Sequence, residues 1–181
     1  MSPNYDTRRL DVSAFARDAC MLRADEALAD FERLLGDAQG PTPDFRIRWE
    51  ARGELRDAAG ATPQVWLHLS AQARLPMTCQ RCLELAAIEV RFERSFRFAA
   101  DEAQAAALDE VCEEDVLVQV RDFNLHELVE DELLLALPLV PVHEVCPQAP
   151  KMSVADAAFV EEAQAKPNPF ELLAGLKTGK I

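Results

Sequence analysis

The chain has 181 residues, of which 49% are hydrophobic, so it can form one compact domain with a core of ordinary size. Its formal net charge of −13 opposes long-range attraction to bare phosphate backbones and favours attraction to basic proteins. Five widely spaced cysteines argue against a secreted disulfide framework, and the lack of a signal peptide or of an apolar run of membrane-spanning length leads us to expect a cytoplasmic protein without a membrane contact.

Residues 1–40 are predicted to form a helical N-terminal segment. Asp11 is a suitable N-cap for a first helix within the helical pattern of residues 11–36. Apolar residues at helical spacing then predict a second helix that ends at Gly36. These residues are Leu28, Phe31, Leu34 and Leu35.

A main domain is expected over residues 41–147. After the break at Gly40-Pro41-Thr42-Pro43, apolar and polar residues alternate, as in half-buried strands. The alternating runs cover residues 45–55, 65–77 and 88–98, and residues 116–120 form a further strand candidate. No helical crossover separates the three long runs, which favours an antiparallel sheet or an open β-barrel of three to five or more strands.

The clearest helix signal lies near residues 124–137. Asn124 is a natural N-cap, Glu127 completes a pattern like a capping box, and Pro138 ends the helix. Residues 148–181 are polar and contain several prolines, which predicts a flexible acidic tail ending in a short amphipathic helix. The fold class that follows is α+β, with N-terminal helices and a partly disordered C-terminal tail.

The most specific local feature is the thiol pair in Cys79-Gln80-Arg81-Cys82, directly after the second long strand. A turn can aim two such thiols at one ion. His143 and Cys146 have the same spacing after the capped helix and can supply the other two ligands. Cys79, Cys82, His143 and Cys146 therefore form a candidate zinc site.

Two other interpretations of the thiol pair remain open. A redox dithiol usually has its first cysteine at the N-terminus of a helix, whereas strand patterns flank Cys79 and Cys82. The two cysteines can also be unligated thiols in a turn. Zinc content per chain distinguishes these interpretations.

Two charged groups are candidates for partner binding. Arg46, Arg48 and Arg52 lie on one face of the first predicted strand. Together with other arginines of the predicted sheet they can form a basic patch that contacts RNA. Glu130 and Asp131 lie on the acidic helix and can contact a basic partner. Cross-strand ion pairs are the alternative for the arginines, and a solvated helix face is the alternative for the acidic pair.

No motif for nucleotide binding, for a nucleophilic serine or for a zinc protease occurs in the chain. His68 and His126 have no neighbouring nucleophile pattern, so neither is assigned a catalytic role. We therefore expect a protein that is not an enzyme and has no evident small-molecule substrate.

Four stretches in order resemble the YceD family, described as large ribosomal RNA subunit accumulation proteins. They are Cys79-Gln80-Arg81-Cys82-Leu83, the run 128–138, Val140-Pro141-Val142-His143, and the run from Lys166-Pro167-Asn168-Pro169-Phe170 to Leu176-Lys177. The resemblance covers most of the chain and is weakest before residue 40. Many relatives have a richer cysteine cluster after this helix, where this chain has only His143 and Cys146.

The resemblance implies a non-catalytic ribosome biogenesis factor that supports synthesis, processing or stability of large-subunit (23S) ribosomal RNA. Its expected partners are a ribosomal protein or the pre-ribosomal large subunit, with direct contact to ribosomal RNA as a further option. Two alternatives are a dithiol or metal-dependent enzyme that uses Cys79 and Cys82, and a zinc-stabilised interaction module unrelated to ribosomes.

Overall fold

The structure is a computed structural model that describes residues 5–42, 44–57, 62–148, 154 and 156. The chain divides into two compact units, Met1–Cys146 and Pro147–Ile181, and all the described helices and strands belong to the first. The predicted flexible tail lies almost wholly outside the described residues, as does its amphipathic helix. No described helix is long and apolar enough to cross a membrane.

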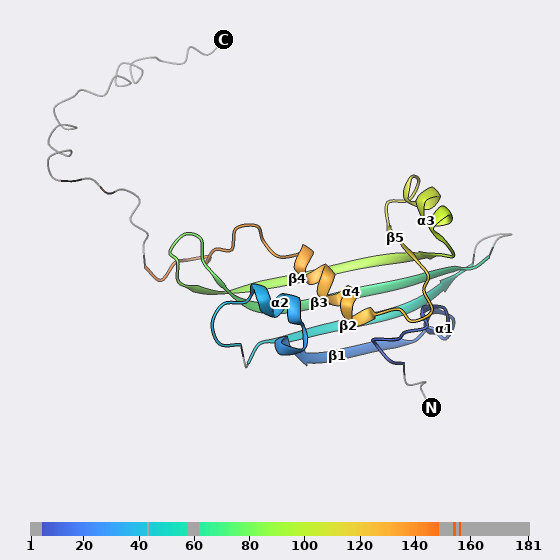
Figure 1. The fold of residues 1–181 in the computed structure, drawn as a ribbon, viewed down its shortest axis with the longest axis horizontal. Coiled ribbons are helices and arrows are strands. Elements are labelled where there is room, and N and C mark those ends of the chain that lie inside the picture. Colours follow the sequence, from blue (N-terminus) through green and yellow to red (C-terminus); the bar gives the residue numbers. More distant parts are fainter. Residues whose placement is uncertain (1–4, 43, 58–61, 149–153, 155, 157–181) are drawn as a thin grey trace, which may run out of the picture. The chain divides into compact units, whose positions relative to one another are not determined.

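One open five-stranded sheet with the strand order β1-β2-β3-β4-β5 organises the first unit (Figure 1). Its strands are β1 (Met21–Ala27), β2 (Arg46–Arg56), β3 (Gln64–Thr78), β4 (Leu85–Ala99) and β5 (Asp115–Val118). The helices are α1 (Val12–Arg17), the short 3-10 helix η1 (Leu28–Asp30), α2 (Glu32–Asp37), α3 (Glu102–Asp109) and α4 (Leu125–Leu135). The α+β class is confirmed.

The sheet is mixed, which corrects the prediction of an antiparallel one. β1 to β4 pair antiparallel in sequence order, but β5 pairs parallel with β4, from Phe96↔Asp115 to Ala99↔Val118. The chain enters β5 after α3, which returns it along the sheet edge. A helix of this kind permits parallel pairing, which a tight turn cannot.

The helical prediction for residues 11–36 is wrong in its central part, where Met21–Ala27 forms β1. This segment contains leucine, arginine, glutamate and two alanines, all good helix formers. Its pairing with β2, from Met21↔Arg52 to Ala27↔Arg46, overrides that local preference. Both flanking helices do form, and Asp11 caps α1 by accepting a 2.9 Å hydrogen bond from the N–H of Ala14.

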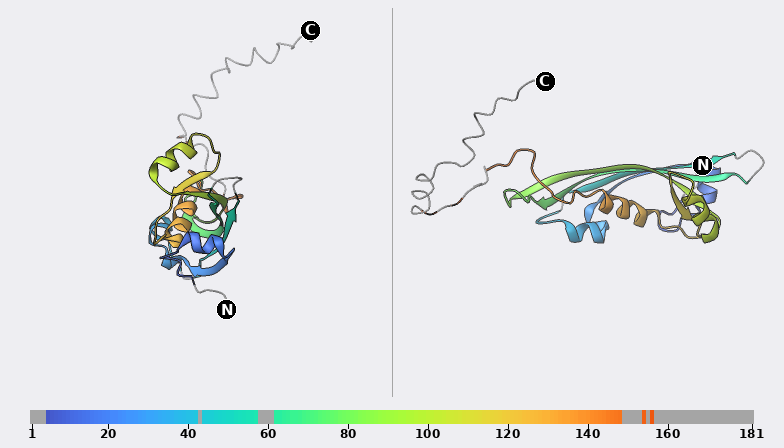
Figure 2. Two further views of the ribbon diagram at one scale, coloured as in Figure 1. Left: turned by 90° about the vertical axis from the view of Figure 1, so that its right-hand side faces the viewer. Right: turned by 90° about the horizontal axis from the view of Figure 1, so that it is seen from above.

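The core lies on one face of the sheet, between the strands and helices α1, α2 and α4. Figure 2 shows α2 and α4 together on one side of the long strands. Leu125, Val129 and Leu133 of α4 are fully buried against the sheet. Asn124 caps α4 as predicted, because its side chain accepts from the N–H of Glu127 at 3.1 Å.

Gly53 allows α1 to lie directly on β2. A Cβ atom at this position would come within 2.7 Å of the carbonyl oxygen of Phe15 and 2.8 Å of the backbone of Ala16. These are backbone atoms and cannot rotate away as a flexible side chain can. Glycine is therefore needed here for close packing of helix on strand.

Candidate metal centre

The turn between β3 and β4 positions the first two ligands. The N–H of Cys79 donates to the carbonyl of Glu84 at 2.9 Å, and the N–H of Leu83 donates to the carbonyl of Cys79 at 2.9 Å. Leu83 adopts a left-handed conformation with φ 64°, which turns the chain back toward β4. Cys79 and Cys82 thus lie in one tight turn, as the sequence predicted.

The segment after α4 brings the other two ligands to this turn. The N–H of Gln80 donates to the carbonyl of Pro141 at 2.8 Å, which joins the turn to the segment before His143. Figure 1 shows this segment running from α4 toward the β3–β4 turn. Two residues after Pro141, the N–H of His143 donates to Sγ of Cys79 at 3.4 Å, which gives a second contact between the two segments.

The four predicted ligands converge. Their ligand atoms all lie within 4.8 Å of one another. Sγ of Cys79 and Sγ of Cys146 are 3.9 Å apart, and Sγ of Cys82 is 3.3 Å from Nδ1 of His143. Around a tetrahedral zinc ion with bonds of about 2.3 Å to sulfur, neighbouring ligand atoms are separated by about 3.8 Å. The cluster can therefore hold a metal ion in a Cys₃His arrangement.

Groups around the ligands prepare them for a metal. Nε2 of His143 lies 3.0 Å from the carbonyl oxygen of Leu85, so a proton on Nε2 leaves the lone pair of Nδ1 directed into the cluster. Arg81 donates from Nε to Sγ of Cys146 at 3.0 Å and from its terminal nitrogen to the carbonyl of His143 at 2.5 Å. Its positive charge offsets part of the excess negative charge that three thiolates carry.

The thiol groups differ in their pKa values. Burial on its own raises the pKa of Cys79, but backbone N–H donors from His143, Cys82 and Arg81 outweigh it and lower that pKa to about 5. At Cys82 the backbone N–H of Glu84 acts to lower the pKa, yet burial and the neighbouring thiols of Cys79 and Cys146 leave it raised. Thiolate is the form that binds metal, so Cys79 is the ligand best prepared in advance.

The redox interpretation gains little from this geometry. The described cysteines are all free thiols, and Sγ of Cys79 lies as close to Sγ of Cys146, at 3.9 Å, as neighbouring sulfur ligands of one zinc ion do. The pair Cys79 and Cys82 lies in a turn between two strands and not at a helix N-terminus. Cys79 is also fully buried, which hinders attack by an external thiol.

The predicted partner-binding residues all have partners within the chain. Arg46 lies 2.5 Å and Arg48 3.2 Å from the carboxylate of Asp25, while Arg52 lies 3.7 Å from Glu54. The predicted cross-strand ion pairs therefore form. A role for these arginines toward an external partner stays a prediction.

Glu130 and Asp131 both contact Arg33 of α2. Glu130 is buried and accepts from Nε of Arg33 at 2.9 Å and from the N–H groups of Arg33 and Leu34 at 2.8 and 3.2 Å. Asp131 pairs with the same guanidinium group. The acidic pair thus joins α4 to the start of α2, and a docking role for it stays a prediction.

The sequence did not reveal a chain of polar contacts across three strands. Oε2 of Glu54 lies 2.6 Å from Nε2 of His68, and Nδ1 of His68 lies 2.8 Å from Oγ of Ser95. His68 and Ser95 are direct cross-strand partners. The strand register was the missing signal, because these residues are far apart in the sequence. Glu54, His68 and Ser95 lie on the adjacent interior strands β2, β3 and β4. We therefore interpret their contacts as side-chain pairs that stabilise the sheet across its strands.

The fold and this cluster define an α+β protein with a five-stranded mixed sheet and a Cys₃His candidate metal centre. The YceD family of large ribosomal RNA subunit accumulation proteins matches residues 67–177, a range that includes all four ligands. The chain belongs to this family.

A Haemophilus influenzae relative named Large ribosomal RNA subunit accumulation protein YceD is 38% identical over 108 residues. The match covers 59% of this chain and 62% of the relative, so it spans less than two thirds of the relative's length. No solved structure matches the chain.

Proposed function

We propose that this protein is a non-catalytic ribosome biogenesis factor that supports the synthesis, processing or stability of large-subunit (23S) ribosomal RNA. The observation that carries the proposal is the family match over residues 67–177, which spans nearly all of β3, the whole of β4, β5 and α4, and the candidate metal centre. The name of the Haemophilus influenzae relative refers to accumulation of the large ribosomal RNA subunit by that protein, which is consistent with the proposal.

The metal that we propose for the cluster is zinc, with a structural role. Three sulfur ligands and one imidazole nitrogen suit zinc, and four protein ligands leave no open position for a substrate. A bound ion would attach the segment after α4 to the β3–β4 turn. It would therefore stabilise the local conformation of a segment that has no helix or strand of its own.

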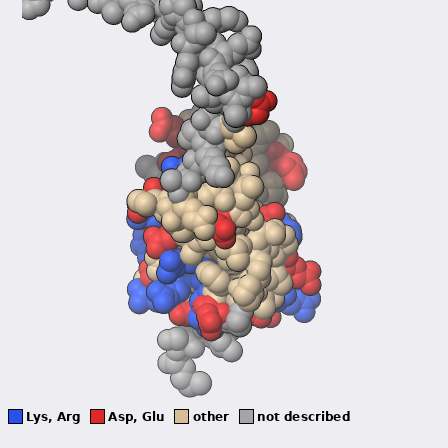
Figure 3. Space-filling view, turned by 90° about the vertical axis from the view of Figure 1, so that its left-hand side faces the viewer, with Lys and Arg blue, Asp and Glu red and all other residues tan. Residues whose placement is uncertain are grey.

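We propose that the surface around this turn binds a protein of the large subunit or of its precursor particle. Apolar side chains are exposed there from both segments that meet at the cluster, although soluble proteins rarely expose several together. They are Leu83, Leu85, Leu139, Val140, Val142 and Val145. Figure 3, which views the molecule from this end, shows uncharged side chains over much of the surface. The net charge of −13 adds a general attraction for basic ribosomal proteins.

The experiment that tests the function compares cells with and without the gene. Lysates are separated on sucrose gradients, and large-subunit RNA is quantified relative to small-subunit RNA. The proposal expects less large-subunit RNA without the gene and restoration by the full chain. Unchanged RNA levels would contradict it and favour an interaction module unrelated to ribosomes.

A further inference from the structure

The two faces of the sheet differ in charge. One face packs on α1, α2 and α4, and we call the opposite one the bare face because no described helix covers it (Figure 2). By the strand register, β1 to β4 place eight arginines and five carboxylates on the bare face, a balance of +3. The whole chain carries −13, so this face has the opposite sign from the rest of the molecule.

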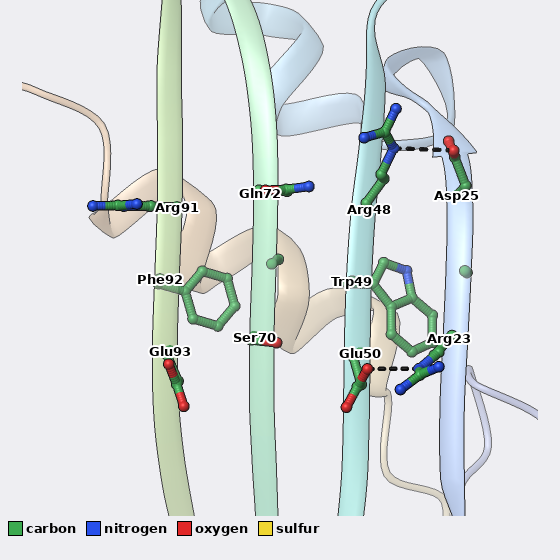
Figure 4. A pocket seen from close by; sticks show the side chains of 12 residues that line it. Arg23, Asp25, Arg48, Trp49, Glu50, Ser70, Gln72, Arg91, Phe92 and Glu93 are labelled. Carbon is green, nitrogen blue, oxygen red and sulfur yellow. Dashed lines mark hydrogen bonds and ion pairs between the residues drawn. The ribbon is translucent and has the colours of Figure 1, made fainter.

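Four of these arginines surround one glutamine. Arg48 and Arg91 are the direct cross-strand partners of Gln72 on its two sides. Arg46 and Arg74 are the next residues on the same face of β2 and β3. Figure 4 shows Arg48, Gln72 and Arg91 at the same level on three adjacent strands. We call Arg46, Arg48, Arg74 and Arg91 the arginine cluster. Like charges at such neighbouring positions repel each other unless an anion lies between them.

Carboxylates of the chain occupy only part of this cluster. The carboxylate of Asp25 forms ion pairs with Nε of Arg46 at 2.5 Å and with Nε of Arg48 at 3.2 Å. Glu89 is 3.8 Å from Arg74, a long and exposed contact, and Arg91 forms no ion pair with any described residue. Each guanidinium group offers five N–H donors, so most donors of the cluster remain available.

The cluster lines a hollow in the sheet surface. All four arginines border a hollow of about 840 Å³, which adjoins a second one of about 900 Å³ through the shared residues Arg48, Gln72 and Arg91. The side chains of Arg46, Arg48 and Arg74 are 51%, 64% and 64% exposed, so an external anion can reach them.

The chemistry of the cluster fits a phosphate backbone. No lysine precedes Lys151, so the cationic side chains of the sheet are arginines, and the planar guanidinium group binds phosphate through two parallel hydrogen bonds. Trp66, the aromatic residue on the bare face, is only 4% exposed and lies beneath Arg56, whose Cζ is 4.0 Å from the ring centroid. It therefore offers no stacking surface for an unpaired base, and Trp49 and Phe92, which also border the larger hollow, have side chains that pack in the core on the opposite face.

We propose that the arginine cluster binds the phosphate backbone of base-paired RNA without reading its sequence. The identification of the RNA as large-subunit ribosomal RNA rests on the proposed function. An acidic peptide is the competing anion, and the observations favour RNA because arginine alone forms the cluster and the two adjoining hollows together extend across four adjacent strands.

The test measures binding of a labelled RNA hairpin by fluorescence anisotropy at several salt concentrations. The double variant R74Q/R91Q removes the two arginines with the weakest internal contacts, and R8Q/R17Q is a control with the same charge change on the N-terminal segment. Thermal unfolding followed by circular dichroism verifies that both variants fold. Polyglutamate serves as the acidic-peptide competitor.

We expect R74Q/R91Q to bind the hairpin about tenfold more weakly than the wild type, and the slope of log K against log salt to fall by about one to two. R8Q/R17Q should bind like the wild type, and polyglutamate should compete poorly. Absence of RNA binding by the wild type, equal binding by the two variants, or displacement by polyglutamate at equal charge concentration would each overturn the proposal.

Measuring large-subunit RNA in cells, in addition to hairpin binding, distinguishes a failure of the arginine-cluster proposal from a failure of the proposed function. A wild-type chain that fails to restore RNA levels in cells lacking the gene contradicts the function, whatever the hairpin measurements show. Restoration by the wild type, together with equal hairpin binding by both double variants, contradicts the arginine cluster alone.

Discussion

Sγ of Cys82 lies 3.3 Å from Nδ1 of His143, although 61 residues separate them in the chain. Between them run the whole of β4, α3, β5 and α4. The β3–β4 turn and the segment after α4 therefore meet at a point that both the sheet and the helix must position. A metal ion at this point would act as a covalent link between the two segments.

The first prediction concerns metal content. Wild-type protein purified without a tag should contain about one zinc per chain, and Cys82→Ser should lower zinc affinity more than about 100-fold because one of four ligands is lost. Cys20→Ser is the matched control, since Cys20 is a free thiol of similar exposure outside the cluster. Metal analysis and competition with a chromogenic chelator provide the measurements. Equal zinc content in both variants would remove Cys82 from the ligand set.

The second prediction concerns the contact between α1 and β2 at Gly53. Gly53→Ala should lower the free energy of unfolding by about 1–3 kcal/mol, because the added methyl group overlaps backbone atoms of Phe15 and Ala16. Gly36→Ala is the control, since a Cβ atom there meets nothing within 4 Å. Urea unfolding gives both values, and the two variants should differ clearly. Similar stabilities would show that α1 does not approach β2 this closely.

The third prediction concerns Glu130, the buried carboxylate of α4. Glu130→Ala removes the acceptor for Arg33 and for two N–H groups at the start of α2, so it should destabilise the protein by about 2–4 kcal/mol. Asp131→Ala removes an exposed contact to the same arginine and should cost less than about 1 kcal/mol. Denaturant unfolding of both variants measures the difference. A larger effect at Asp131 than at Glu130 would contradict the assigned contacts.

The fourth prediction concerns pH and Glu54. Hydrogen bonds from Arg56 and then His68 lower the pKa of Glu54 from 4.5 to about 2. A lowered pKa in the folded state contributes stability that is complete above about pH 4.5 and disappears as the pH falls toward 2. Glu54→Gln should therefore cost about 1 kcal/mol at pH 7, since solvent screens part of the interaction, and almost nothing near pH 2.

Unfolding of Glu54→Gln and of the control Glu93→Gln should be followed by circular dichroism between pH 2 and pH 7. Glu93 lies on the same face and has no ion pair with any described residue, so its substitution should have little effect. A cost at Glu54 that did not change across this range would show that the effect comes from packing and not from the charge.

Much of the fold and of the candidate site follows from local patterns. The alternation in β2, β3 and β4, the Asn124 cap of α4 and the two pairs of ligands spaced three apart were all readable, because each depends on neighbours in the sequence. The helical interpretation of Met21–Ala27 failed for the same reason: its residues favour a helix locally, and only the edge of β2 makes it a strand.

By itself, the sequence therefore determined the α+β class, the ligand types and their spacing, and the positions of the arginines along β2. Only the tertiary structure decided that β5 runs parallel to β4, that Cys82 meets His143, and that Arg91 lies across Gln72 from Arg48. These relationships join segments distant in the chain. They depend on strand register and on packing of α4 against the sheet, which no local pattern encodes.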